Sequence, residues 1–127
     1  MEKELKQKVD EVKASGLSVF SVKINSRPFV YRAINRREFR QLQLEIADMA
    51  EKVKQKFSTN EAEMNSQLSL IKEKGEEKLV VLSLLDPKLE LETDTDQIPA
   101  GAVTRIADLV MRASGFDDAE PDEPEQL

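Results

Sequence analysis

The densest group of residues able to do chemistry in this sequence is a set of arginines. Five of the seven arginines fall between residues 27 and 40, where Glu38 is the only acid. A guanidinium group is planar and permanently charged, so such a cluster suits carboxylates or phosphates. In the helix predicted after Asn35, the arginines at 36 and 40 share a face while the one at 37 points elsewhere. The five are Arg27, Arg32, Arg36, Arg37 and Arg40.

These arginines could interact with protein carboxylates, with water alone, or with a nucleic acid. A cationic first turn is unfavourable for a helix, by about 0.3–1 kcal/mol per exposed charge, because the macrodipole favours anions there. This small cost indicates an anionic partner. A nucleic acid is the less favoured choice, because no stacking platform or nucleic-acid motif accompanies the arginines. Two interpretations remain open. The arginines bind carboxylates, within the chain or on another protein, or they form a face that contacts only water.

The chain offers little material for catalysis or metal binding. It has no cysteine and no histidine, which removes thiolate chemistry, the most frequent general base and the usual zinc ligands. Asp94 and Asp96 alternate like calcium ligands, but the glycine and distal glutamate of a calcium loop are missing. Residues 99–101 lack the spacing of a phosphate loop. We therefore expect no enzyme, no cofactor and no metal, but a protein that acts by binding.

The net charge of −6 belongs to the end of the chain. Residues 117–127 hold six of the 25 acids and none of the 19 bases, so the remainder is electrically balanced. Two prolines and few apolar side chains predict that this acidic tail is disordered when free. We interpret it either as a solubilising tail or as a segment that orders on a basic partner or on the chain's own arginines.

Length and hydropathy bound the class of protein. A chain of 127 residues predicts one domain, which we place at residues 1–116. No apolar run reaches the roughly 18 residues of a membrane-spanning helix. The charged, helix-patterned N-terminus indicates no secretory signal and a cytoplasmic protein. The patterns below predict an α+β domain, mainly helical, in which one hairpin packs with about four helices.

The first third of the chain predicts a helix followed by two strands. In residues 1–16 apolar side chains recur every three or four positions, and Gly16 can end the helix. Residues 17–34 are rich in β-favouring side chains on both sides of a turn at Asn25–Arg27, which predicts a β-hairpin. A lone hairpin is marginal in water. It must therefore pack on the helices or pair with another chain.

The helical part, residues 35–116, begins with the clearest pattern in the sequence. Asn35 is a good N-cap, and apolar residues then recur at spacings of three and four. Such a stripe suits a core face or a short coiled-coil seam, and we favour the core face because the repeat is short. The stripe consists of Phe39, Leu42, Ile46, Met49, Val53 and Phe57.

Four further segments complete the predicted domain. A second helix runs up to Gly75 as an antiparallel partner of the first long helix. Residues 78–85 are apolar nearly all round, and we favour a buried helix over a buried strand. Residues 88–98 predict a loop. A last helix follows, with Gly115 as its C-terminal stop and Phe116 placed for the hydrophobic contact that accompanies such an end.

Taken in order, short motifs of these elements resemble a known family. The order is an aromatic strand with F-x-Y-R, a helix start with R-E-F, two glutamates before an apolar run that ends in Asp-Pro, a proline–glycine helix start, and SGF. It resembles the small tail assembly chaperones and baseplate-hub assembly proteins of tailed bacteriophages, over residues 19–116. The residues are Phe29-Val30-Tyr31-Arg32, Arg37-Glu38-Phe39, Glu76-Glu77 before Leu85-Asp86-Pro87, Pro99-Ala100-Gly101 and Ser114-Gly115-Phe116.

The resemblance implies a non-enzymatic protein that binds other tail proteins while the tail is built. Its partners would be the tape measure protein or subunits of the baseplate hub or tube, met in the host cytoplasm during assembly. We expect partner binding at the corner between hairpin and helix. The residues are Tyr31, Arg32, Arg36, Arg37, Arg40 and Phe116.

Other functions stay open beside this one. A structural component of the baseplate or tail would remain in the virion, whereas a chaperone would leave it. A small host-directed or nucleic-acid-binding regulator would use the cluster Arg27–Arg40. The hairpin could also pair with a second copy, so a homo-oligomer is a further alternative.

Overall fold

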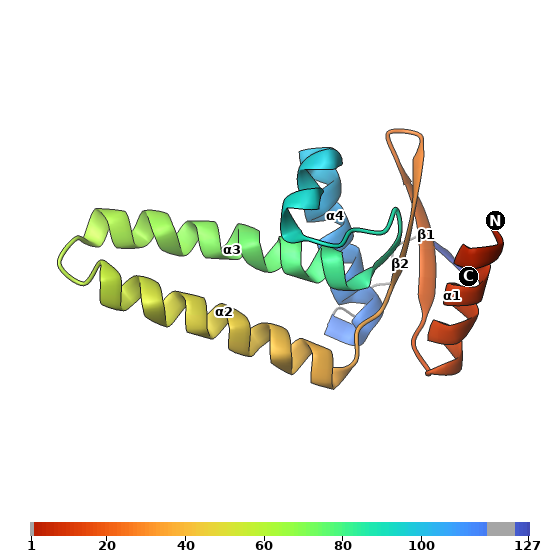
Figure 1. The fold of residues 1–127 in the computed structure, drawn as a ribbon, viewed down its shortest axis with the longest axis horizontal. Helices are drawn as coiled ribbons and strands as arrows, with labels where there is room; N and C mark the ends of the chain where they lie inside the picture. Colours follow the sequence, from red (N-terminus) through yellow and green to blue (C-terminus); the bar gives the residue numbers. More distant parts are fainter. Residues whose placement is uncertain (1, 117–123) are drawn as a thin grey trace.

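A small antiparallel sheet separates the N-terminal helix from the other helices in the computed structural model, which describes residues 2–116 and 124–127 (Figure 1). The predicted α+β, mainly helical fold is confirmed. The helices are α1 (Lys3–Ala14), α2 (Arg36–Lys56), α3 (Glu61–Ser83), the 3-10 helix η1 (Glu92–Gln97), α4 (Ala100–Met111) and its terminal turn η2 (Arg112–Phe116). The strands are β1 (Val19–Ile24), β2 (Arg27–Arg32), β3 (Leu84–Asp86) and β4 (Glu125–Gln126).

The predicted hairpin forms the centre of the sheet, whose strand order is β3-β2-β1-β4. Asn25 and Ser26 make the turn with φ values of 53° and 64°. Both values lie in the left-handed region that two-residue hairpin turns need. The hairpin therefore does not stand alone, because a short strand covers each of its outer edges.

Alternation along the strands divides the core in two. Phe29 and Tyr31 of β2 point into the main core beneath α3 and α4. Val30, between them, points to the opposite face, where it meets Val19 and the buried Val9 of α1. This period-two pattern explains why α1, with a thin apolar stripe, lies on the far face of the sheet.

Helices α2 and α3 form a hairpin that projects from the body of the molecule (Figure 1). The predicted N-cap is confirmed: the amide of Glu38 donates to Oδ1 of Asn35 at 2.8 Å, and Oε1 of Glu38 accepts from the amide of Asn35 at 3.1 Å. Of the six stripe residues of α2, only Leu42 is buried. The stripe is therefore only half covered, in contrast to the core face that the periodicity predicted.

The predicted helix end at Gly75 is wrong, because α3 continues to Ser83. Gly75 is buried inside the helix, and a Cβ there would lie 3.0 Å from Cδ1 of Ile46. The missing side chain thus allows α2 to approach. The separate buried helix predicted at residues 78–85 is also wrong: its first part belongs to α3, and Leu84–Asp86 forms β3 beside β2.

The loop predicted at residues 88–98 contains η1. Oδ2 of Asp94 accepts hydrogen bonds from the amides of Glu90 and Leu91, at 3.0 and 2.9 Å. Oγ1 of Thr95 donates to the carbonyl of Glu92 at 2.7 Å. These local side-chain bonds fold the acidic segment into a helical turn, which the turn-forming composition alone did not predict.

The end of the chain returns to the sheet. Gly115 has a φ of +91°, as the predicted helix stop requires. Residues 117–123, most of the predicted disordered tail, lie outside the described residues. Residues 124–127 differ from that prediction, because the amide of Leu127 donates to the carbonyl of Val19 at 2.8 Å and its side chain packs in the α1-side core.

Candidate functional site

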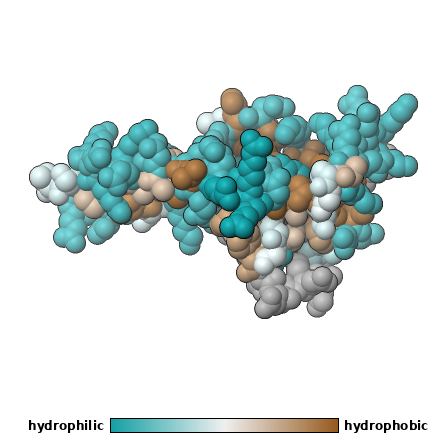
Figure 2. Space-filling model, turned by 90° about the horizontal axis from the view of Figure 1, so that it is seen from below, coloured by the Kyte–Doolittle hydropathy of each residue, from teal (hydrophilic) through white to brown (hydrophobic). Residues whose placement is uncertain are grey.

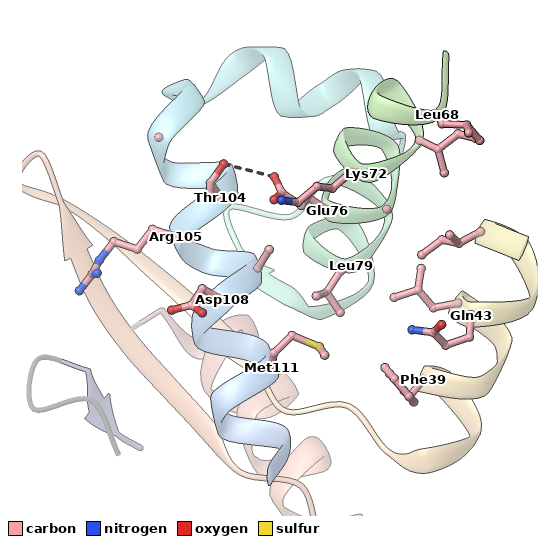
Figure 3. A pocket seen from close by; sticks show the side chains of 16 residues that line it. Phe39, Gln43, Leu68, Lys72, Glu76, Leu79, Thr104, Arg105, Asp108 and Met111 are labelled. Carbon is pink, nitrogen blue, oxygen red and sulfur yellow. Dashed lines mark hydrogen bonds between the residues drawn. The ribbon is translucent and has the colours of Figure 1, made fainter. Parts of the chain in front are cut away.

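An open groove of about 860 Å³ lies where α2, α3 and α4 meet. Figure 3 shows side chains from the three helices converging on it. Its apolar lining is the inner face that the periodicity predicted as core, left uncovered on one side. The main apolar residues are Phe39, Leu42, Ile46, Leu68, Leu79 and Met111.

Small residues on two helices keep the groove open. Gly75 of α3 and Gly101 and Ala107 of α4 all line it. Since α4 crosses α3 instead of lying along α2 (Figure 1), none of the described elements fills the angle between α2 and α4. The result is a concave apolar surface with the dimensions of a binding site. Along the projecting arm, hydrophobic residues interrupt the otherwise hydrophilic surface (Figure 2).

The rim of the groove is polar, and its acids are engaged within the fold. Oγ1 of Thr104 donates to Oε2 of Glu76 at 3.2 Å, the dashed line in Figure 3. Nε of Arg112 donates to Oδ2 of Asp108 at 2.9 Å. Lys72 adds a cation to the same α3 wall as Glu76. The walls on α3 and α4 therefore carry both signs of charge.

Toward its N-terminus, the α2 side of the groove leads to the corner between the hairpin and α2, where the predicted arginines lie. Gln43 lines the groove, and Arg40 and Arg36 precede it by three and seven residues in one row of the helix. Both arginines are exposed, and neither forms an ion pair with any residue that the structure describes. Arg37 lies on the other side of α2, where it lines a separate cleft with Glu38 and Glu45.

Arg32 faces inward and joins three elements. Its guanidinium donates to both carboxylate oxygens of Glu38, at 2.9 and 2.7 Å, and to the carbonyl of Leu82 at 3.2 Å. The side chains of Arg32 and Glu38 are only 14% and 23% exposed. The hydrogen bonds from Arg32 hold the pKa of Glu38 below its usual value. Arg32 thus positions the start of α2 and does not present its charge to a partner.

Tyr31 is buried and also faces inward. Its ring stacks on Phe20 with centroids 5.6 Å apart. Burial raises the pKa of the Tyr31 hydroxyl to about 12, and nearby Arg105 offsets this rise only in part. Of the predicted partner-binding residues, Tyr31 and Arg32 therefore support the corner from within the fold.

Phe116 lies at the α2 end of the groove. It is 51% exposed, and its ring contacts Phe39 with centroids 4.4 Å apart. The amide of Ile34 donates to Oγ of Ser114 at 2.9 Å, which fixes this turn beside the start of α2. The structure thus brings Phe116 to Phe39, the neighbour of Arg40 in the sequence of α2. Arg27 is separated from them: it lies at the opposite end of β2 from Arg32, over the ring of Phe29.

The second cleft, on the other side of α2, is crossed by ion pairs. Nζ of Lys78 lies 2.9 Å from a carboxylate oxygen of Glu92 and 3.6 Å from one of Glu45. The hydrogen bond with Glu92 raises the pKa of Lys78, and the same bond lowers the pKa of Glu92. Lys78 therefore ties α3 to α2 and η1, a structural role that leaves the apolar groove as the candidate site.

Metal and membrane sites are not found in the part of the chain that the structure describes. No group of three or more acidic side chains there is placed to hold a metal ion. None of its helices is long and apolar enough to cross a membrane. Asp94, considered above as a calcium ligand, is used in hydrogen bonds to the backbone of its own turn.

Comparisons with protein-family models, with curated proteins and with solved structures found no match for this chain. Function is therefore argued from the groove and its corner. Sequence reasoning identified the corner but missed the groove. The apolar stripe of α2 supplies one wall of the groove, but its periodicity does not show which part of the stripe is left uncovered.

Proposed function

We propose that this protein is a non-enzymatic assembly protein of a bacteriophage tail or baseplate. As an assembly chaperone it binds an apolar helical segment of another tail protein, such as the tape measure protein or a hub subunit. The observation that carries the proposal is the open apolar groove between α2, α3 and α4, next to exposed arginines. The resemblance of its short motifs supplies the tail-assembly context.

The groove suits a helix better than an extended peptide. Its walls are themselves helices, and an amphipathic helix laid in the groove would cover Phe39, Ile46 and Leu68, which are partly exposed here. Recognition of this kind uses apolar anchors at spacings of three and four residues. Each Å² of apolar surface covered contributes about 25 cal/mol, and the entropy cost of association offsets much of this gain, which favours a reversible complex.

Reversible binding fits an assembly chaperone. The client of such a chaperone would carry apolar helical segments that are buried only once the tail is complete, and exposed apolar surface promotes unspecific association. A small protein that covers such a stripe and then leaves would prevent this association. A permanent component of the baseplate or tail would use the same groove but remain in the virion.

Mass spectrometry of purified particles and of assembling cells tests the proposal. We expect the protein in complex with a tail protein in cells that are building tails, and its absence from finished particles. Detection in particles at stoichiometric copy number would instead establish a virion component. Absence of any tail protein from its complexes in assembling cells would contradict the proposed function altogether.

A further inference from the structure

We propose that the groove selects an amphipathic helix with acidic residues along the flank that lies against α2. The inference rests on the proposed function and specifies the chemistry of the partner. Its basis is the unequal charge of the groove walls. On α3, Lys72 stands near Glu76, and on α4, Arg105 and Asp108 line the groove, with Arg112 paired to Asp108. The α2 wall itself carries no charged lining residue, and beside it stand the exposed Arg36 and Arg40, in the helix row of Gln43.

The two arginines are available to a partner. Both are exposed, and among residues 2–116 and 124–127 no carboxylate lies within ion-pair distance of either. They also sit in the first turns of α2, where cations are disfavoured by the helix macrodipole. A carboxylate placed beside them would gain from both guanidinium groups and would offset that unfavourable position.

The spacing of the arginines defines the acidic flank. Arg36 and Arg40 are four residues apart, which is about 6 Å along the helix. A partner helix lying beside α2 would match this spacing with acids three or four residues apart, on the edge of its apolar face. Its apolar residues would then reach the groove floor at Leu42, Ile46 and Met111.

Phe116 marks the end of the same surface. It is half-exposed against Phe39, within the corner that Arg36 and Arg40 border. A binding surface with an aromatic anchor next to arginines has the composition of protein interfaces, which are enriched in both. A nucleic acid would meet a rim with charges of both signs, and Glu76 and Asp108 on the facing walls would repel its phosphates.

The test uses two synthetic peptides and the full chain. Both peptides are 18-residue helices with the same leucine face; one carries glutamates on the flank and the other lysines. The matched variants are Arg40→Glu on the groove side and Arg37→Glu on the opposite side of α2. Both substitutions change the net charge by the same amount and lie in the first turns of α2. They differ only in the face of α2 on which the charge changes.

We expect the unchanged protein to bind the glutamate peptide about tenfold more tightly than the lysine peptide at low salt. Arg40→Glu should weaken binding of the glutamate peptide several-fold. The double variant Arg36→Glu with Arg40→Glu should bind the lysine peptide more tightly than the glutamate peptide. Arg37→Glu should change either affinity less than twofold. The melting temperatures should stay equal or rise slightly, because acids suit the start of a helix.

Equal affinity for the two peptides would overturn this inference and leave the proposed function intact. Failure to bind either peptide, with a folded protein, would count against the groove itself. Displacement of the glutamate peptide by duplex DNA, lost in Arg40→Glu, would overturn the inference in favour of nucleic acid. Self-association through the same arginines would overturn it in favour of a second copy.

Discussion

A single guanidinium group connects three elements of this fold. Arg32 belongs to β2, its partner Glu38 belongs to the first turn of α2, and Leu82 near the end of α3 accepts a further hydrogen bond. Glu38 is also the acid of the α2 capping box. One ion pair therefore fixes both where α2 begins and how it leaves the sheet, and with it the position of the arginine row on α2.

This pair predicts how the stability of the protein depends on pH. Since the pKa of Glu38 is lower in the folded than in the unfolded state, the pair stabilises the fold above the unfolded pKa of about 4.3. That contribution is lost as the pH falls through the folded pKa. Glu38→Gln should therefore lower the free energy of unfolding at pH 7, by roughly 1–3 kcal/mol, and flatten its decline below pH 4.

Urea unfolding of both proteins between pH 3 and pH 7 measures this difference. The two stability curves should converge toward the acid end, because protonation removes the same charge that the substitution removes. Parallel curves over the whole range would show that the Arg32–Glu38 pair contributes little. A suitable control is Glu51→Gln, an exposed acid further along α2 with no ion pair among the described residues.

At the scale of elements, the edges of the sheet depend on residues far along the chain. β4 contributes two residues, which pair with Phe20 and Ser21 of β1. Leu127 adds an apolar contact in the α1-side core. β4 thus covers backbone groups of β1 that would otherwise form an open edge, a frequent site of association between chains.

Deletion of residues 124–127 should therefore have two effects. The midpoint of thermal unfolding should fall, because the partly buried Leu127 side chain contributes about 1–2 kcal/mol. The exposed edge of β1 should also promote association that grows with concentration, visible by light scattering after size-exclusion chromatography. Leu127→Ala, which keeps the backbone pairing, should show the first effect without the second. An unchanged, monomeric truncated protein would contradict this role.

The elements that the sequence predicted are those specified by neighbouring residues. The hairpin turn at Asn25, the N-cap at Asn35 and the stop at Gly115 each act within a few residues of their own position. Gly75 was misread as a helix end because its role is defined by Ile46, almost thirty residues away. β3 and β4 were missed for the same reason: each is a strand only because a neighbouring strand pairs with it.

At the scale of the whole molecule, the proposed function depends on how the helices cross. The chain uses its sheet as a wall, places α1 on one face, and projects α2 and α3 from the other (Figure 1). The groove lies where α4 runs across α3, and the ring of Phe116, in the turn after α4, contacts Phe39 of α2. No local pattern encodes that angle. The sequence could therefore predict the corner, from its arginines and aromatic residues, but not the apolar surface beside it.

The most direct test of the account is to photocrosslink from the groove in cells that are assembling tails. Leu68 lines the groove, whereas Leu70, on the same helix, is 43% exposed and is not among the residues that line it. Each is replaced in turn by benzoylphenylalanine. We predict an adduct from position 68 with a tail protein, mapped to an amphipathic helix with an acidic flank, and none from position 70. Equal adducts from both positions, or none from position 68 in a folded protein, would contradict the account.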